Sequence, residues 1–212
     1  METPHELLQW YQAKQPEIEK RLQEFRHVWK RTDEEIFAEL CFCILTPQSK
    51  AEACDEIIRT LKQNGLLFRG EAEDLKPLLK KTRFHKTKSG YIVEARRLFQ
   101  KNGSVKIKDK VHPEDVFATR EWLVENVRGI GYKEASHFLR NIGLGEDIAI
   151  LDRHVLRALK RLGVLKDFPG SLTPKRYVSI ERKVKKFADR IHIPLSHLDL
   201  LFWSVQANRI FK

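Results

Sequence analysis

Residues 127–135 have the sequence VRGIGYKEA, and this stretch decides the fold because it joins two apolar-patterned segments through a very short turn. Gly129 and Gly131 flank the single apolar residue Ile130, and a new helix begins immediately after them. Glycine accepts positive φ and lets another backbone approach closely, and the first turn of a helix presents unpaired N–H groups and a positive dipole end. The stretch predicts a hairpin that Ile130 anchors and that binds a phosphate, although a Gly-x-Gly alone also fits an ordinary helix connection.

Helix signals continue in both directions from this hairpin. Thr3 and Thr32 each begin a capping box, in which side chains satisfy the N–H groups that start a helix. No stretch keeps a two-residue alternation, and no Asn-Gly or Asp-Gly turn lies between β-rich runs, so no strand hairpin is predicted. The sequence predicts an all-α fold in which Pro16 begins a second helix, Pro47 ends a third, and later helices cover 49–64, 91–102, 113–127, 153–162, 174–191 and 194–207.

The excess of basic residues lies in two blocks. The chain has 40 Lys and Arg against 29 Asp and Glu, a net charge of +11. Residues 76–110 hold 12 basic and 2 acidic side chains and residues 153–190 hold 12 and 3, whereas residues 111–152 are net −4. One charged run is usually a solvated helix face, but two such blocks predict salt-dependent binding to a polyanion such as nucleic acid.

Length and composition exclude several classes of protein. A chain of 212 residues can bury a core without covalent staples. Its content of 42% apolar and 33% charged residues excludes a disordered tail and a membrane protein. The three cysteines, Cys41, Cys43 and Cys54, make no disulfide framework and are interpreted as small buried hydrophobes of a cytosolic protein. The histidines show no metal-ligand spacing.

The residues after the hairpin make the pattern more specific. The loop NIGLGE at residues 141–146 follows, and Asp152 stands 19 residues after Lys133 within AILDRHV, residues 149–155. This combination resembles the helix-hairpin-helix DNA glycosylases, the superfamily that includes endonuclease III. The stretch GIGYKEASHFLRNIG, residues 129–143, and the final Lys212 are similar to the second type of 8-oxoguanine DNA glycosylase/lyase, found chiefly in archaea and some thermophilic bacteria. The resemblance covers essentially the whole chain.

The resemblance implies a catalytic role for Lys133. A base inside duplex DNA cannot be attacked, so its nucleotide must first be extruded. A lysine amine can then attack C1′ of the sugar and hold it as a Schiff base, provided that its surroundings favour the neutral amine. Without the motif, Lys133 would be interpreted as a solvated helix lysine.

Asp152 has two compatible interpretations. An aspartate just before a helix is a preferred N-cap, and a capped carboxylate keeps a fixed orientation and its charge. The resemblance implies that Asp152 also stabilises the positive charge that develops on the sugar and assists proton transfer.

Three further residues are candidates for DNA or base contacts. The resemblance implies that Gln48 fills the gap left by the extruded base, Trp203 lies against that base, and Lys212 contributes to its recognition. Each has a plainer alternative: Gln48 as a turn residue, Trp203 as a core residue, and Lys212 as a frayed terminus.

These observations predict a DNA repair glycosylase and AP lyase that acts on damaged double-stranded DNA and removes 8-oxoguanine. We expect two helical subdomains around a cleft, one over residues 33–146 and one combining 1–32 with 147–212. We further expect a nucleoid-associated cytoplasmic monomer with no cofactor, no metal and no membrane association. Two alternatives stay open: an endonuclease III-like enzyme for oxidised pyrimidines, which the missing C-terminal cysteine cluster disfavours, and a non-catalytic helix-hairpin-helix DNA-binding protein.

Overall fold

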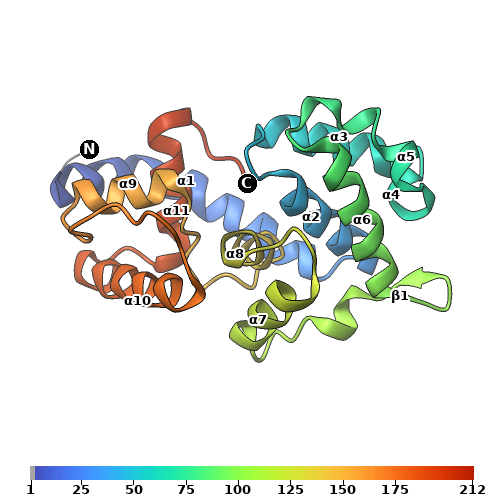
Figure 1. The fold of residues 1–212 in the computed structure, drawn as a ribbon. Helices are drawn as coiled ribbons and strands as arrows, with labels where there is room; N and C mark the ends of the chain where they lie inside the picture. Colours follow the sequence, from blue (N-terminus) through green and yellow to red (C-terminus); the bar gives the residue numbers. More distant parts are fainter. Residues whose placement is uncertain (1–2) are drawn as a thin grey trace.

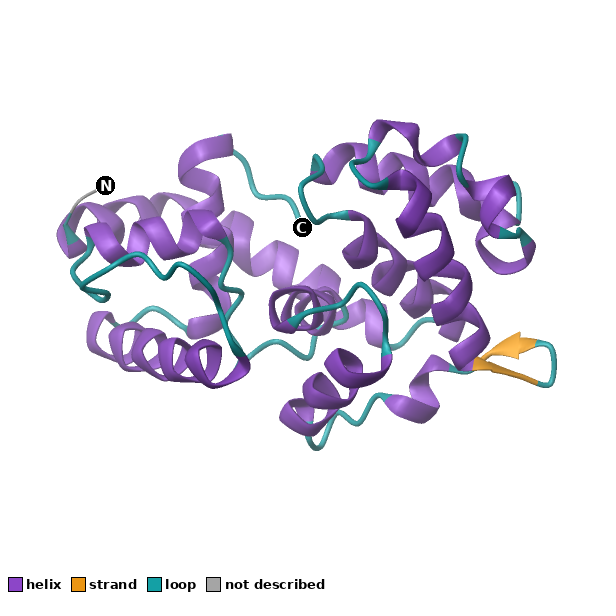
Figure 2. Cartoon of the chain, viewed as in Figure 1, coloured by secondary structure: helices purple, strands orange, loops and turns teal. Residues whose placement is uncertain are grey.

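Helices make up nearly all of the regular structure in the computed structural model, which describes residues 3–212 (Figures 1 and 2). This confirms the prediction of an all-α fold. The helices are α1 (Pro4–Trp29), α2 (Asp33–Leu45), α3 (Ala51–Gln63), α4 (Leu66–Arg69), α5 (Ala72–Leu75), α6 (His85–Phe99), α7 (Val116–Asn126), α8 (Tyr132–Asn141), α9 (Arg153–Arg161), α10 (Pro174–Ile191) and α11 (Leu195–Ala207), with 3₁₀ turns η1 (Leu78–Lys81) and η2 (Ile107–Lys110). None of the helices within residues 3–212 is both long enough and apolar enough to cross a bilayer.

The first helix corrects the prediction of a break at Pro16. Helix α1 runs without interruption through Pro16, which is exposed. Proline removes one helical hydrogen bond, and at an exposed position water can satisfy the carbonyl that loses its partner. Buried side chains on both sides of the proline, among them Tyr11 and Ile18, hold the two halves of α1 against the same core.

A short strand hairpin also differs from the sequence prediction. Strands β1 (Gln100–Lys101) and β2 (Ser104–Val105) pair antiparallel beside the end of α6. Asn102 and Gly103 form the turn with φ of 52° and 77°, and these positive angles are those that a two-residue hairpin requires. The paired strands are only two residues long, so the amino-acid pattern gives no alternation that would predict this hairpin.

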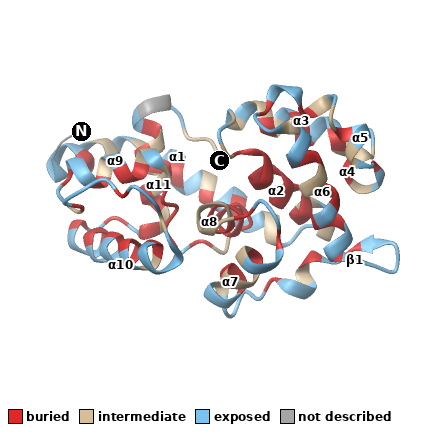
Figure 3. Ribbon diagram, in the orientation of Figure 1, coloured by how far each residue is buried: buried red, intermediate tan, exposed pale blue. Residues whose placement is uncertain are grey.

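The buried residues form two hydrophobic clusters. In the first, all residues of α2 from Ile36 to Leu45 are buried except Glu39, and α3, α6 and α8 pack around this helix (Figure 3). The second cluster joins buried residues between 7 and 25 of α1 to buried residues between 149 and 202, which lie on α9, α10, α11 and the segments that connect them. The two clusters support the proposed division into subdomains 33–146 and 1–32 plus 147–212, which stays a prediction.

Candidate active site

The hairpin between α7 and α8 places the start of α8 at the surface. Asp115 caps α7 by accepting a hydrogen bond from Ala118 N at 2.9 Å, so this helix begins at Val116 and not at Pro113 as predicted. Gly129 has φ of +87°, and a Cβ there would collide with the ring of Tyr91. Ile130 is buried in the first cluster and anchors the turn.

The second glycine of the hairpin has a different role from the first. Gly131 is the N-cap of α8 with an extended backbone, φ −104° and ψ −175°. The left-handed conformation is therefore needed only at Gly129. The exposed N–H groups at the start of α8 fit an anion, which is consistent with the predicted phosphate contact.

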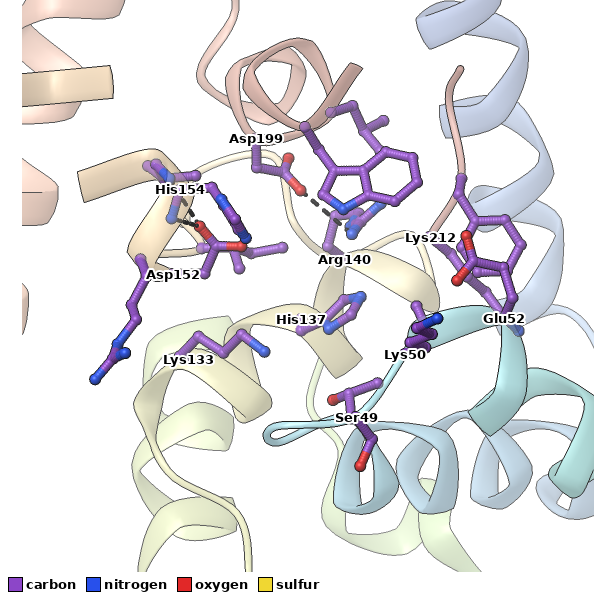
Figure 4. Close-up of a pocket in the computed structure, with 18 of the residues that line it drawn as sticks. Ser49, Lys50, Glu52, Lys133, His137, Arg140, Asp152, His154, Asp199 and Lys212 are labelled. Atoms are coloured by element: carbon purple, nitrogen blue, oxygen red, sulfur yellow. Dashed lines mark hydrogen bonds and ion pairs between the residues drawn. The ribbon is translucent and has the colours of Figure 1, made fainter. Parts of the chain in front are cut away.

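Lys133 is the second residue of α8, and its side chain extends into a pocket of about 770 Å³ (Figure 4). Its amine lies 3.6 Å from Glu134 Oε1. The two groups form an ion pair at this distance, which is too long for a hydrogen bond. A buried apolar side of α8, including Ala135, Phe138 and Leu139, packs on the first cluster and directs the polar residues of the helix toward the pocket.

Asp152 reaches the same pocket from the N-terminus of α9. Its Oδ1 accepts hydrogen bonds from His154 N at 2.8 Å and Val155 N at 2.7 Å, which makes Asp152 the N-cap of that helix. Within residues 3–212, Oδ2 accepts no hydrogen bond, and Asp152 forms no ion pair with Lys133. The two side chains therefore line the same pocket without a direct bond between them.

The opposite side of the pocket holds Lys212 (Figure 4). The Lys212 amine lies 2.9 Å from Glu39 Oε1 and 2.7 Å from Asp55 Oδ1, and 4.6 Å from the centre of the Phe42 ring. Burial alone would lower the pKa of this amine, but the charges of Glu39 and Asp55 and their hydrogen bonds outweigh burial and raise the pKa. Lys212 is therefore a fixed cation and not a frayed terminus.

Trp203 and Gln48 complete the set of predicted residues that the pocket brings together. The ring of Trp203 lies 6.2 Å from that of Phe211 at an angle of 33°, so Trp203 is a wall of the pocket and is only partly buried. Gln48 is exposed at the rim with φ of 55°, in the turn that follows α2. The hairpin residues 129–131 do not line the pocket and lie at the start of α8 instead.

Lys88 supports the turn that carries Gln48. Its buried amine donates to Leu45 O at 2.6 Å, Pro47 O at 2.8 Å and Ser49 Oγ at 3.1 Å. The amine thereby satisfies the carbonyl of Leu45, the last residue of α2, and that of Pro47 in the turn, and all three acceptors are neutral. Burial lowers the pKa of Lys88 to about 8.

Sequence reasoning missed His137, which lies one helical turn after Lys133. His137 is buried, its ring packs edge-on against Phe42 at 5.7 Å, and neither ring nitrogen has a hydrogen-bond partner within the described chain. Burial and then the charges of Arg140, Lys133 and Lys212 hold the pKa of His137 well below its usual value, so the ring is neutral. The spacing of Lys133, His137 and Arg140 along one side of a helix was the available signal.

Arg140 and Asp199 form a buried ion pair at the back of the pocket, 3.2 Å apart. The guanidinium also lies 4.7 Å from the centre of the Phe25 ring. Among residues 3–212, no three His, Cys, Asp or Glu side chains gather in a way that suits a metal ion.

Comparison with known proteins agrees with this arrangement. Residues 18–193 match a family model described as 8-oxoguanine DNA glycosylase. The chain belongs to the 8-oxoguanine DNA glycosylase family. An 8-oxoguanine DNA glycosylase/AP lyase of Fusobacterium nucleatum is 44% identical over 210 residues, 98% of this chain and 97% of that protein. One of Methanocaldococcus jannaschii is 40% identical over 198 residues, 92% of this chain and 91% of that protein.

Solved structures of this glycosylase family share the fold. The crystal structure of the Methanocaldococcus jannaschii 8-oxoguanine DNA glycosylase has a TM-score of 0.87 at 36% identity and covers 99% of this chain and 95% of its own. A structure of the glycosylase/lyase of that organism with a 15mer DNA containing 8-oxoguanine has a TM-score of 0.86 at 36% identity, with 97% and 99% covered. The predicted family is confirmed, whereas the roles of individual residues stay predictions.

Proposed function

We propose that this protein excises 8-oxoguanine from duplex DNA and then cleaves the strand at the resulting abasic site. The observation that carries the proposal is that Lys133 and Asp152, from two different helices, line one pocket beside the hairpin. A volume of about 770 Å³ lies within the range of pockets that enclose small ligands. It is therefore large enough for an extruded nucleotide.

Extrusion places the base among the aromatic and polar side chains of the pocket. Trp203 offers a partly exposed ring on which a base can stack. The neutral ring of His137 adds two nitrogens with no hydrogen-bond partner among residues 3–212, so a bound base can offer them one. Gln48, exposed on its rigid turn, is suited to fill the gap that the base leaves in the duplex.

Lys133 supplies the nucleophile in this proposal. Its unprotonated amine attacks C1′ of the deoxyribose, a new C1′–Nζ bond forms, and the bond from C1′ to N9 of the base breaks. The base leaves with the bonding electron pair and takes up a proton. Opening of the sugar ring, with O4′ protonated, then gives the Schiff base between C1′ and Lys133.

Asp152 supplies negative charge where positive charge develops. Its Oδ1 is occupied by the N-terminal N–H groups of α9, and Oδ2 remains available to face the sugar. A preoriented carboxylate stabilises a developing cation without needing to reorganise. The same carboxylate can accept a proton from the attacking amine.

Strand cleavage follows from the Schiff base. Removal of a proton from C2′ lets an electron pair form the C2′–C3′ double bond, and the 3′ phosphate leaves with its C–O electrons. Hydrolysis of the remaining imine then frees Lys133. We propose that this sequence of steps uses the protein's own residues and that a monomer is active.

One assay tests the proposed function against its alternatives. The protein is incubated with duplexes that contain one 8-oxoguanine, one thymine glycol or no lesion, and borohydride is added to reduce any Schiff base. We expect a covalent adduct with the 8-oxoguanine duplex alone. An adduct with only thymine glycol would indicate a glycosylase for oxidised pyrimidines, and DNA binding without any adduct would indicate a non-catalytic protein.

A further inference from the structure

The segment that delivers Asp152 to the pocket has no regular structure of its own. Residues 148–151 lie between the end of α8 and the start of α9, and side chains of α10 satisfy their backbone groups. Ala149 N donates to Glu181 Oε1 at 2.9 Å, and Leu151 N donates to Tyr177 Oη at 3.1 Å. The Tyr177 hydroxyl in turn donates to Ala149 O at 2.7 Å. Two side chains of α10 thus hold the last residues before Asp152.

An arginine on another helix holds Glu181. Arg120 of α7 donates to both carboxylate oxygens, at 2.6 and 2.8 Å, and the two side chains are only 1% and 6% exposed. Burying an ion pair costs desolvation energy that its attraction does not reliably repay, so such a pair is weak evidence for stability. The pair fixes the position of the Glu181 carboxylate, which in turn accepts the hydrogen bond from Ala149 N.

The same group of side chains also contacts α8, which carries Lys133. Ser136 Oγ, one turn after Lys133, lies 3.3 Å from both Arg120 Nη1 and Tyr177 Oη. The ring of Tyr132, the residue before Lys133, lies 5.3 Å from that of Tyr177. Helix α8, α10 and the 148–151 segment therefore meet at one buried polar network.

We propose that Arg120, Ser136, Tyr177 and Glu181 form a positioning network that fixes the Asp152 carboxylate relative to Lys133. None of these four side chains lines the pocket, so they act on the reaction only through the two residues that do. The network couples the helix of the nucleophile to the segment of the carboxylate across the two hydrophobic clusters. This inference rests on the proposed function, because it assigns the network to the excision step.

The variant Tyr177→Phe tests the network with the smallest change, since it removes one hydroxyl and keeps the ring. Displacing a catalytic group by about 1 Å can cost about a hundred-fold in rate. We expect the single-turnover rate of 8-oxoguanine excision to fall about ten- to a hundred-fold, with the Kd for the lesion duplex unchanged. Ser136→Ala, which removes only the link to α8, should give a smaller slowdown of the same kind.

Tyr11→Phe provides a matched control. Tyr11 is also buried in the second cluster, and its hydroxyl lies 3.0 Å from Nδ1 of His197, but within residues 3–212 it forms no hydrogen bond with the 148–151 segment. We expect this variant to lose comparable thermal stability and to keep the wild-type excision rate per folded molecule. Equal rates for Tyr11→Phe and Tyr177→Phe would overturn the proposal.

A double variant separates positioning from general damage. If Tyr177 acts through Asp152, adding Tyr177→Phe to Asp152→Asn should slow excision little beyond Asp152→Asn alone. A full additional slowdown would overturn the proposal. A wild-type protein that fails to excise 8-oxoguanine would instead contradict the proposed function, so the two failures are distinguishable.

Discussion

Two lysines face the same pocket in opposite electrostatic surroundings. Lys212 lies between the carboxylates of Glu39 and Asp55, at 2.9 and 2.7 Å, and its pKa is raised. Within residues 3–212, Lys133 forms one ion pair, with Glu134 Oε1 at 3.6 Å. An amine clamped by two anions keeps its proton and serves as a fixed charge, and within residues 3–212 no such pair of carboxylates clamps the Lys133 amine. This contrast supports the proposal that Lys133 is the nucleophile and that Lys212 contributes to base recognition.

The largest expected effect comes from removing the amine of Lys133. Lys133→Gln keeps a polar side chain of similar length but cannot form a Schiff base, so borohydride trapping on the 8-oxoguanine duplex should be lost completely. The Kd for that duplex should change little, because the hairpin and the basic surfaces remain. Lys14→Gln, in an ion pair on α1 far from the pocket, serves as the control. If borohydride trapping persists in Lys133→Gln, another lysine forms the Schiff base and the proposed difference between Lys133 and Lys212 is wrong.

Asp152→Asn is expected to have the next largest effect. Asparagine is about as good an N-cap as aspartate, so α9 should keep its start and the free energy of unfolding should change little. The charge is lost, and we expect single-turnover excision to slow by about 10²- to 10⁴-fold.

A second aspartate offers a matched control for that variant. Asp115 caps α7 in the same way and lies outside the pocket. Asp115→Asn should therefore leave the excision rate unchanged. Equal slowing of both variants would show that capping, and not charge, explains the effect.

Lys212→Met tests the other half of the comparison. Two partly buried carboxylates lose their cation, which should cost about 1–3 kcal/mol of unfolding free energy and slow excision of the lesion about ten-fold or more. Trapping at a preformed abasic site should persist, because no base has to be recognised there. A complete loss of trapping would instead make Lys212 part of the covalent chemistry.

The stability loss in Lys212→Met should also depend on pH. Burial raises the pKa of Asp55, but the hydrogen bond and charge of Lys212, aided by Arg59, outweigh burial and lower the pKa from 3.8. In the wild type, this contribution to stability is present above that value and is lost as the pH falls through the lowered pKa. Urea unfolding at pH 7 and below pH 4 should show the difference between wild type and variant shrinking in acid. A difference independent of pH would mean that packing alone explains it.

The helical fold was predictable because capping residues and apolar spacing are local signals. Thr3 and Thr32 cap α1 and α2 as predicted, with hydrogen bonds to Glu6 N and Glu35 N. The failures came where tertiary packing overrides a local signal. Pro16 is such a case, because the core beneath α1 holds the helix together through the proline. The Asn102–Gly103 turn was missed because its strands are too short to show alternation.

The candidate site was predictable only where a motif marked it. Lys133 and Asp152 were found through the family resemblance that the hairpin, the loop and their 19-residue spacing carry, and both line the pocket. Glu39, Asp55 and His137 were missed, because a polar residue on an apolar helix gives no sign of which distant side chain it will meet. Glu39 meets Lys212 from 173 positions away in the chain. The pairs of Lys212 with Glu39 and Asp55 form only when α2, α3 and the C-terminal residues pack against one another.

A third lysine gives the smallest expected effect and the sharpest test of the comparison. The amine of Lys88 is buried like that of Lys212, but its acceptors at Leu45 O, Pro47 O and Ser49 Oγ are all neutral. Burial therefore lowers its pKa to about 8, whereas the carboxylates around Lys212 raise the pKa there. In ¹³C NMR of lysine labelled at Cε, we expect one resonance that titrates near pH 8 and is missing in Lys88→Met, while the Lys212 resonance titrates above pH 10.5.

The Lys88 amine also predicts a pH dependence of stability with a definite sign. Between about pH 8 and 10.5, the unfolded chain binds a proton at Lys88 that the folded protein has lost, so this group makes stability rise with pH across that window. The rise in stability should be absent in Lys88→Met. This variant also leaves two carbonyls without a donor and loosens the turn that carries Gln48, so we expect excision to slow by only a few-fold. If Lys88 titrates at its ordinary value, the charge of the acceptors cannot be what separates Lys88 from Lys212.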